Sequence, residues 1–183
     1  MGIWRLLSYS NCKQQRQAAL RNLAPGSLIL FGSTLNGNFV LDTVFVVRDS
    51  QRYRPDQPPQ CDDAFRVCTI QALLTGADCS GDEFTLYRGA TYDTQVEGMY
   101  SFAPCRRMDC KEPRFARPPI SLLADYLDPK SKRNPSKAGI ARSVSEVREQ
   151  WESVRRRVLD DCCLLGISFP TPRLDDGRKD GPR

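Results

Sequence analysis

The sequence predicts an α+β protein built around a small mixed β-barrel, with flanking helices and a C-terminal helix. Three observations lead to this prediction. Residues 27–47 contain two apolar runs joined by an Asn-Gly turn, a strong short-range signal for a β-hairpin. Several short strand-like segments follow without the regular intervening helices of a parallel sheet. Residues 143–166 repeat apolar positions every three or four residues, as an amphipathic helix does.

The N-terminal elements are expected in the order strand, helix and hairpin. Residues 3–10 mix aromatic and aliphatic side chains over the length of a strand. Residues 12–23 are rich in helix formers, with Asn11 as the candidate N-cap. Pro25 and Gly26 are then expected to end the helix and to form a turn before the next strand.

Both strands of the hairpin are apolar on both faces, so they must be covered on both faces or closed into a barrel. The period of two predicts that one face holds Leu28, Leu30, Phe39, Leu41, Thr43, Phe45 and Val47, and that the other holds Ile29, Phe31, Val40, Val44 and Val46. Asp42 interrupts this apolar run. A charged residue in an apolar strand needs hydrogen-bond partners. Asp42 would either accept hydrogen bonds from backbone amides, which is a structural role, or accept them from the edge of a bound base.

The rest of the barrel domain, residues 1–126, is expected to contain short elements. Residues 48–64 predict a surface loop, and 65–76 fit either a strand or a short helix. Strands are predicted within the segments 83–93, 98–105 and 114–123. Residues 127–142 form a basic linker, and the polar tail, residues 167–183, is predicted to be disordered.

The late helix, residues 143–166, has clear boundaries in the sequence. Ser143 and Glu146 have the spacing of a capping box, and Gly166 is expected to end the helix. The apolar stripe of this helix consists of Val144, Val147, Trp151, Val154 and Val158. That stripe must be buried, either on its own barrel or on a second chain.

Composition limits the chemistry that this chain can perform. The sequence has no histidine, which excludes Ser-His-Asp triads, Cys-His nucleophilic pairs and mixed Cys/His zinc sites. The eight cysteines lack zinc-ribbon spacing and are expected to be free thiols. No Walker loop or dinucleotide fingerprint is present, and we expect no metal or cofactor. A signal peptide and a membrane-length apolar run are also missing, which predicts a cytosolic protein without a membrane partner.

The charge of the chain favours nucleic acid as a partner. The 183 residues have a net charge of +5, and the basic residues are 21 Arg against 6 Lys. Arginine binds phosphate bidentately and stacks on bases, although a GC-rich genome would also enrich it. Most of the excess lies after Tyr126, where the net charge is +4 against +1 before it. We therefore expect binding to DNA or RNA that weakens strongly with salt.

The order strand, helix, Pro-Gly turn, apolar strand, Asn-Gly turn and apolar strand resembles the opening of the PUA-like superfamily, which includes the EVE, ASCH and YTH domains. "LAPGSLILFGS" and "NFVLDTVFVV" are similar to that segment, and "LSYSNC" is similar to the pocket-side end of strand one in YTH domains. The resemblance covers residues 3–47 and, loosely, 83–104. It implies a nucleic-acid-binding barrel whose pocket accepts one flipped, possibly modified base. The tryptophan cage of YTH domains is not expected, because both tryptophans, Trp4 and Trp151, are placed as core residues.

The candidate binding residues are polar or aromatic and lie at strand ends and in the later short strands. For the base they are Ser8, Tyr9, Ser10, Asn11, Ser33, Thr34, Asp42, Tyr87, Arg88, Tyr92, Asp93, Tyr100, Ser101 and Phe102. For phosphate they are Arg114, Arg117, Lys132 and Arg133, with Arg88 as a further phosphate ligand. Aromatic side chains supply stacking faces, and small polar groups read the base edge.

The first functional hypothesis is a nucleic-acid sensor that works beside an effector protein in a bacterial defence or DNA-modification system. The second is a metal-dependent enzyme acting on nucleic acid or nucleotides, with Asp42, Asp93 or Glu97 as general base or metal ligand. The third is a protein–protein adaptor that docks through the late helix. No catalytic residue is assigned under the first hypothesis.

Overall fold

The computed structural model describes residues 3–4, 7–10, 14, 18–36, 38–54, 56–61, 63–71, 83–106, 114–120 and 143–170. In chain order its elements are β1 (Ile3–Trp4), β2 (Ser8–Tyr9), η1 (Ala18–Arg21), β3 (Leu28–Leu35), β4 (Asn38–Tyr53), α1 (Asp63–Phe65), η2 (Arg66–Gln71), β5 (Phe84–Gly89), β6 (Ala103–Arg106), β7 (Arg114–Phe115), α3 (Val144–Asp160), β8 (Leu164–Gly166) and β9 (Phe169–Pro170). The fold is mainly antiparallel sheet with few helices, which confirms the α+β prediction. None of the helices within these ranges is long and apolar enough to cross a membrane.

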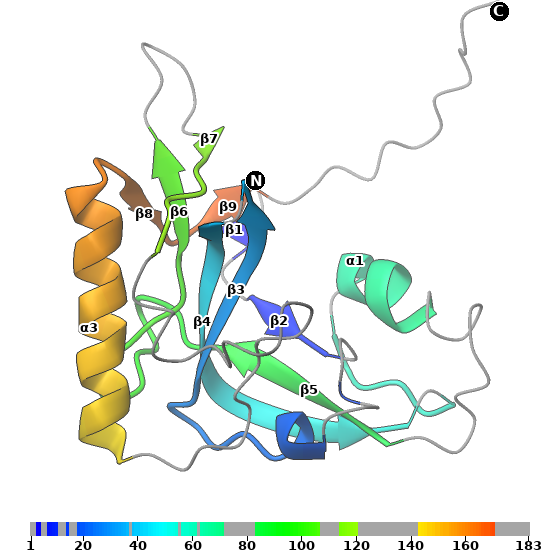
Figure 1. Cartoon of the computed structure of the whole chain (residues 1–183). Helices are drawn as coiled ribbons and strands as arrows, with labels where there is room; N and C mark the ends of the chain where they lie inside the picture. The colour runs from blue at the N-terminus through cyan, green and yellow to red at the C-terminus, as the bar shows by residue number, and fades with distance from the viewer. Residues whose placement is uncertain are drawn as a thin grey trace, which may run out of the picture.

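A curled four-stranded sheet in the order β2-β5-β4-β3 forms the centre of the fold (Figure 1). The long strand β4 pairs with β3 along its first half and with β5 along its second half. Tyr9 in β2 and Phe31 in β3 belong to the two outer strands, yet their ring centroids lie 5.3 Å apart. Within the described ranges no backbone pairing joins β2 to β3. The sheet is therefore curled, and the closed barrel predicted from the sequence is not found there.

Two β-bulges in β4 accommodate Asp42 and Arg48, two of the four charged residues of this strand. Phe31 pairs with Thr43 and Gly32 with Leu41, so Asp42 is the extra residue of the first bulge. In the same way Arg48 has no partner between the pairs that Val47 and Asp49 form with β5. A bulge lets a charged residue leave the ladder without moving an apolar neighbour out of the core.

The first bulge also corrects the predicted faces of the hairpin. Leu41 packs with Val44 and Val46 in one core cluster, whereas Phe45 and Val47 pack in another. The predicted alternation is right up to Leu41 and is inverted after it, because the extra residue shifts the period by one. The hairpin is covered on both faces, as its composition indicated.

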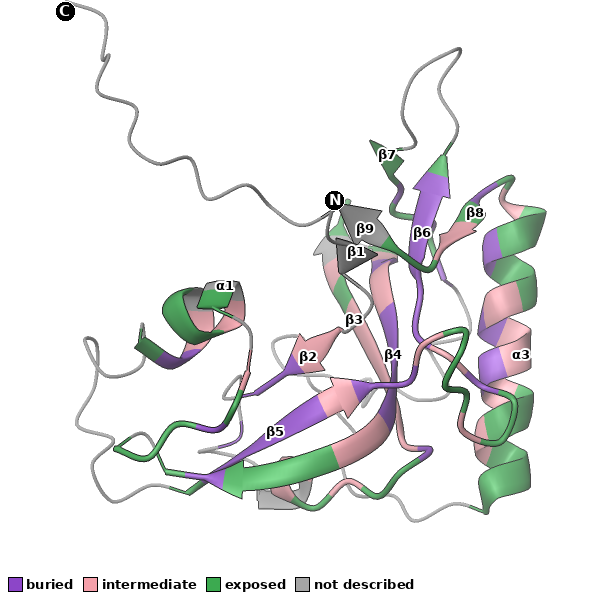
Figure 2. Ribbon diagram, turned by 180° about the vertical axis from the view of Figure 1, so that it is seen from behind, coloured by how far each residue is buried: buried purple, intermediate pink, exposed green. Residues whose placement is uncertain are grey.

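Helix α3 covers one face of the hairpin and shares its core. Trp151, Val154 and Val158 are buried against the sheet, and they form the purple stripe on α3 in Figure 2. Val147 is half-buried, and Val144, predicted to belong to the stripe, is 53% exposed. Three of the five predicted stripe residues are therefore buried within their own chain, which favours packing of α3 on its own sheet over packing on a second chain.

The capping box of α3 is confirmed, but the helix ends earlier than predicted. The Ser143 and Glu146 side chains each bond the backbone N–H of the other residue. At the far end Cys162 has a φ of 57°, and the Cys163 N–H donates to the Val158 carbonyl at 3.1 Å. This is the six-to-one bond of a Schellman cap, with a cysteine in the left-handed position that glycine usually fills. Gly166 instead ends the strand β8.

Other boundaries also differ from the sequence analysis. β4 continues through residues 48–53, which were predicted as loop, because its second half pairs with β5. The undecided segment 65–76 is helical as far as Gln71. Of the predicted helix 12–23 the structure describes the short η1 and Gln14, and of the predicted tail it describes β9, paired with β1. The linker 127–142 lies outside the described residues.

Candidate nucleic-acid interface

Three aromatic residues expected to line a pocket lie in the interior instead. Tyr9, Tyr87 and Phe102 are 7%, 0% and 0% exposed. Tyr9 stacks on Tyr87 with ring centroids 6.0 Å apart and meets Phe31 and Phe45 edge-on. We call Tyr9, Phe31, Phe45 and Tyr87 the inner aromatic cluster. A base would reach these rings only if the core opened, so their burial argues against a stacking role.

The hydroxyl group of Tyr87 also forms hydrogen bonds within the protein. It donates a hydrogen bond to the Leu20 carbonyl at 2.9 Å and accepts one from the Leu23 N–H at 3.0 Å. Burial raises the pKa of Tyr87 above its ordinary value, and the bond from Leu23 partly offsets that rise. Tyr87 therefore fastens the chain after η1 to the sheet.

The predicted serines are held by neighbouring groups of the fold. The Ser10 and Tyr53 hydroxyl oxygens lie 2.8 Å apart in a buried hydrogen bond. The Ser101 Oγ accepts a hydrogen bond from the Val46 N–H at 3.0 Å and is likewise buried. Ser8 is half-buried in β2. These hydroxyl groups satisfy the protein's own polar atoms, as buried polar groups must.

Arg88, the predicted phosphate ligand, is occupied by protein acceptors. Its guanidinium donates to the Asp49 carboxylate at 3.0 Å and to both the Gln51 side chain and the Gln60 carbonyl at 3.1 Å. Burial alone would raise the pKa of Asp49, but the hydrogen bonds from Arg48 and Arg88 outweigh it and lower that pKa. Arg88 therefore ties the chain at Gln60 to the sheet.

Asp42 and Arg117 form an ion pair with each other. The Arg117 Nε lies 2.7 Å from the Asp42 Oδ1, and the two side chains are 62% and 30% exposed. The contact lacks hydrogen-bond alignment, since Oδ1 is buried and accepts no hydrogen bond within the described part of the chain. The bulge and the ion pair together favour a structural role for Asp42 over a base-edge role.

The remaining predicted residues are scattered. Ser33 and Thr34 lie in β3 near the hairpin turn, Asp93 is exposed after β5, and Arg114 is exposed in β7. Three predicted residues lie outside the described ranges: Asn11, Lys132 and Arg133. The predicted set therefore does not converge on one pocket.

A second aromatic group forms at the surface, from Tyr92, Tyr100 and Trp151, and we call it the outer aromatic row. Ring centroids lie 5.2 Å apart for Tyr92 and Tyr100 and 5.0 Å apart for Tyr100 and Trp151, both edge-to-face. The Trp151 Nε1 donates to the Tyr100 carbonyl at 2.9 Å. Trp151 is 2% exposed, whereas Tyr92 is 54% exposed. The row thus runs from the core to solvent.

Charged side chains of α3 lie next to this row. The guanidinium carbon of Arg155 is 5.6 Å from the centre of the Trp151 ring, a cation–π contact. Burial raises the pKa of Tyr100, the charge of Arg155 opposes that rise, and Tyr92 and Glu152 add to it. The outer aromatic row therefore lies close to both a positive and a negative side chain, Arg155 and Glu152 of α3.

The loop 91–100 presents Tyr92 beside α3. Val96 and Met99 pair through two backbone hydrogen bonds of 2.9 and 3.0 Å. Between them Glu97 and Gly98 have φ of 52° and 78°. A two-residue turn with two positive φ values favours Asn, Asp or Gly, so a glutamate at its first position is uncommon and costs backbone energy.

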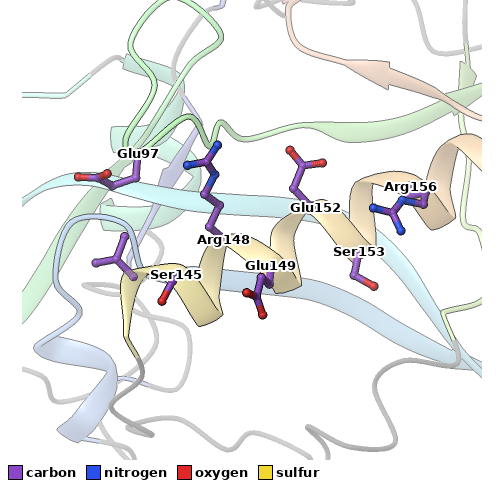
Figure 3. Close-up of a pocket in the computed structure, with 8 residues that line it drawn as sticks. Glu97, Ser145, Arg148, Glu149, Glu152, Ser153 and Arg156 are labelled. Atoms are coloured by element: carbon purple, nitrogen blue, oxygen red, sulfur yellow. The ribbon is translucent and has the colours of Figure 1, made fainter.

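An open depression runs along the solvent side of α3, next to this loop (Figure 3). A Cβ placed on Gly98 would lie 4.0 Å from a guanidinium nitrogen of Arg148, so the loop and the helix are in contact. Arg148 and Glu152 point to one side of the helix, and the carboxylate of Glu97, on the loop, points away from Arg148. The depression is lined by Glu97, Val144, Ser145, Arg148, Glu149, Glu152, Ser153 and Arg156.

Four charged residues in this depression are unpaired. Elsewhere most arginines of the described ranges are in ion pairs with carboxylates: Arg48, Arg52, Arg54, Arg66, Arg88, Arg106, Arg117 and Arg155. Arg148, Arg156, Glu97 and Glu149 form no ion pair with any residue that the structure describes. Two cations and two anions therefore remain available to a ligand.

The structure adds no support for a metal-dependent enzyme. Within the described ranges no three Cys, Asp or Glu side chains gather where they would hold a metal ion. Asp42 is paired with Arg117 on β4, whereas Asp93 and Glu97 lie on the surface loop.

Sequence reasoning missed the arginines of α3. Arg148 and Arg156 are eight residues apart, a spacing that places both on the solvent side of a helix whose apolar stripe was already recognised. That spacing was a usable signal, but nothing in the sequence shows that residues 91–100 lie against it.

Comparison with family models, curated proteins and solved structures finds no match to this chain. The resemblance to the PUA-like superfamily stays a prediction, and function is argued from the site.

Proposed function

We propose that this chain binds nucleic acid through an outer face made of Tyr92, Tyr100, Glu97, Arg148 and Arg156. The observation that supports this proposal most is the exposed Tyr92, which Tyr100 anchors to the core, on a loop whose Gly98 lies against the unpaired Arg148. This arrangement keeps the two parts of the predicted site, stacking aromatics and arginines, but moves them from the strands to the loop 91–100 and α3.

Tyr92 has the properties of a stacking platform. It is 54% exposed, and its edge-to-face contact with Tyr100 supports the ring from one side. Stacking of a base on an aromatic side chain contributes about 1–3 kcal/mol and tolerates any base. An exposed aromatic ring on a supported loop therefore suits an unstacked nucleotide.

Arg148 and Arg156 are the expected phosphate ligands. Their separation of eight residues corresponds to about 12 Å along the helix axis. The unpaired Glu97 and Glu149 lie in the same depression and repel a continuous phosphate backbone. With two phosphates neutralised on a single strand, log K should fall with log[salt] at a slope of about −1.4. This slope is shallower than the strong salt dependence expected from composition.

The first test is fluorescence anisotropy with a labelled single-stranded 12-mer and the matching duplex. Tyr92→Ala should weaken binding about tenfold, because one stacking contact is lost. Phe115→Ala is the matched control, since Phe115 is 72% exposed but lies on β7. Absence of binding to both oligonucleotides at about 100 μM protein, the weak end of non-specific affinity, would overturn the proposal.

The second test measures the salt dependence of the same binding. Replacing both Arg148 and Arg156 with alanine should remove most of the slope, because their phosphate contacts are lost. Arg114→Ala is the comparison, since Arg114 is an exposed arginine that forms no ion pair within the described ranges. A larger effect of Arg114→Ala would move the interface from α3 to β7.

A further inference from the structure

The solvent side of α3 carries a row of polar side chains that is complementary to itself about the middle of the helix. The row lies opposite the buried stripe, and spacings of three and four residues connect its members: Ser145, Glu149, Glu152, Ser153, Arg156 and Asp160. All of them are exposed except Glu152 and Ser153, which are half-buried. Five of the six line the depression along α3 (Figure 3).

Glu149 and Arg156 hold the open charges of this row. Neither side chain is in an ion pair with any group in the described part of the chain, whereas Glu152 binds Arg155 at 3.0 Å. Glu149 and Arg156 are separated by about two helical turns, or about 10 Å along the axis, so they do not pair with each other. A partner must therefore present a cation to Glu149 and an anion to Arg156.

We propose that this partner is α3 of a second copy of the chain, docked antiparallel along the solvent side of α3 around a twofold axis. An axis between Glu152 and Ser153 places each residue opposite the residue that is equally far from the axis on the other helix. Glu149 of each copy then faces Arg156 of the other copy, which makes two ion pairs. Glu152 of each copy faces Ser153 of the other, whose hydroxyl group is a donor for the carboxylate.

The two ends of the helix fit the same arrangement. Ser145 of one copy faces Asp160 of the other, again a hydroxyl group against a carboxylate. Val144 and Leu159 are 53% and 42% exposed at opposite ends of α3, and antiparallel docking brings Val144 of one copy beside Leu159 of the other. A parallel arrangement would instead set like charges against each other, so the charges select the antiparallel one.

The dimer is independent of the proposed function, although both use Arg156. A second copy would cover Arg156, so it would compete with a phosphate group for that side chain. The 17 residues of α3 span about 25 Å. Two helices of this length bury less surface than a standard interface, so we expect a weak dimer that depends on protein concentration.

Sedimentation velocity of the full chain without nucleic acid tests the dimer, at protein concentrations up to about 1 mM, the weak end of the affinity scale. The parent protein should pass from monomer to dimer as its concentration rises. Glu149→Arg and Arg156→Glu should each weaken dimerisation about tenfold or more, because the twofold axis turns two ion pairs into two like-charge contacts. Arg114→Glu reverses an exposed charge on β7 and is the matched control, which should leave the dimer unchanged.

A mixture of the two variants distinguishes this interface from any other. Glu149→Arg and Arg156→Glu proteins in equal amounts should form a heterodimer with the affinity of the parent, since each new charge meets its opposite. One chain that carries both substitutions should also dimerise as the parent does. Melting temperatures at low protein concentration should change little, because both positions are exposed, so loss of the dimer is not loss of the fold.

Three results would overturn the inference and leave the proposed function standing. The first is a parent protein that stays monomeric up to about 1 mM. The second is a single variant, Glu149→Arg or Arg156→Glu, that dimerises as tightly as the parent. The third is a mixture of the two variants that stays monomeric.

Discussion

The inner aromatic cluster and the outer aromatic row both contain tyrosines in ring contact with other aromatic side chains, but the two groups differ in exposure. The inner rings of Tyr9 and Tyr87 are nearly or fully buried, and the Tyr87 hydroxyl is saturated by backbone partners. The outer row begins in the core at Trp151 and ends in solvent at Tyr92. In the inner cluster all rings come from strands that curl around one another. In the outer row Tyr92 and Tyr100 come from the loop 91–100, and Trp151 comes from α3.

This difference shows that an aromatic residue becomes available to a ligand through its supporting element, not through its residue type. A ring on any strand of the curled sheet, outer strands included, is enclosed by rings from the other strands. A ring on a loop that rests against a helix is supported from one side only. Three variants test this comparison, from the largest expected loss of stability to the smallest.

Trp151→Ala should have the largest effect, because Trp151 anchors the outer row in the core shared by α3 and the sheet. We expect a loss of about 3–5 kcal/mol in the free energy of unfolding, measured by urea denaturation. Trp151→Phe keeps a ring but removes the hydrogen bond to the Tyr100 carbonyl, and should cost less. A loss below about 1 kcal/mol for the alanine variant would show that α3 is not seated on the sheet.

Tyr87→Phe should have an intermediate effect on the inner cluster. It removes only the hydroxyl oxygen, which leaves the Leu23 N–H and the Leu20 carbonyl without their partner. We expect a loss of about 1–3 kcal/mol in the free energy of unfolding, with oligonucleotide affinity unchanged. If affinity falls while stability is kept, the inner cluster is part of the binding site and the comparison is wrong.

Tyr92→Ala should have the smallest effect on stability, because the ring is more than half exposed. The free energy of unfolding should change by no more than about 0.5 kcal/mol, while oligonucleotide binding weakens as described above. Thermal unfolding followed by circular dichroism is sufficient to measure this. A loss of about 2 kcal/mol or more would place Tyr92 among the structural residues.

Much of the fold could be predicted from local signals. The hairpin has an Asn-Gly turn, and the helix start has a capping box at Ser143, so both were identifiable from a few residues. The end of α3 was missed because Cys162 occupies the left-handed cap position where glycine is the usual signal. The second half of β4 was missed because its residues are polar and its pairing partner, β5, lies more than 30 residues away in the chain.

The proposed interface uses the residue types that the sequence pointed to, tyrosine and arginine, but at other positions in the fold. Tyr92 and Tyr100 were named from their segment, and the structure puts them in ring contact. Tyr87 and Arg88 were named for the same reason, yet long-range partners commit them to the fold. Burial and pairing of this sort depend on which segments meet in space, and a local pattern of tyrosine and arginine is the same in both cases.

The bulge at Asp42 has a consequence for how this protein can change over evolutionary time. A substitution at Asp42 alters one side chain and its ion pair with Arg117. Deleting Asp42 would remove the extra residue and leave a regular ladder in which Thr43 directly follows Leu41, so the following side chains would keep the faces that they occupy now. Inserting one more residue at this point would instead exchange the residues that face α3 with those that face the inner aromatic cluster, as far as the next bulge. This position should therefore accept the replacement or the loss of Asp42 far more readily than the gain of a further residue.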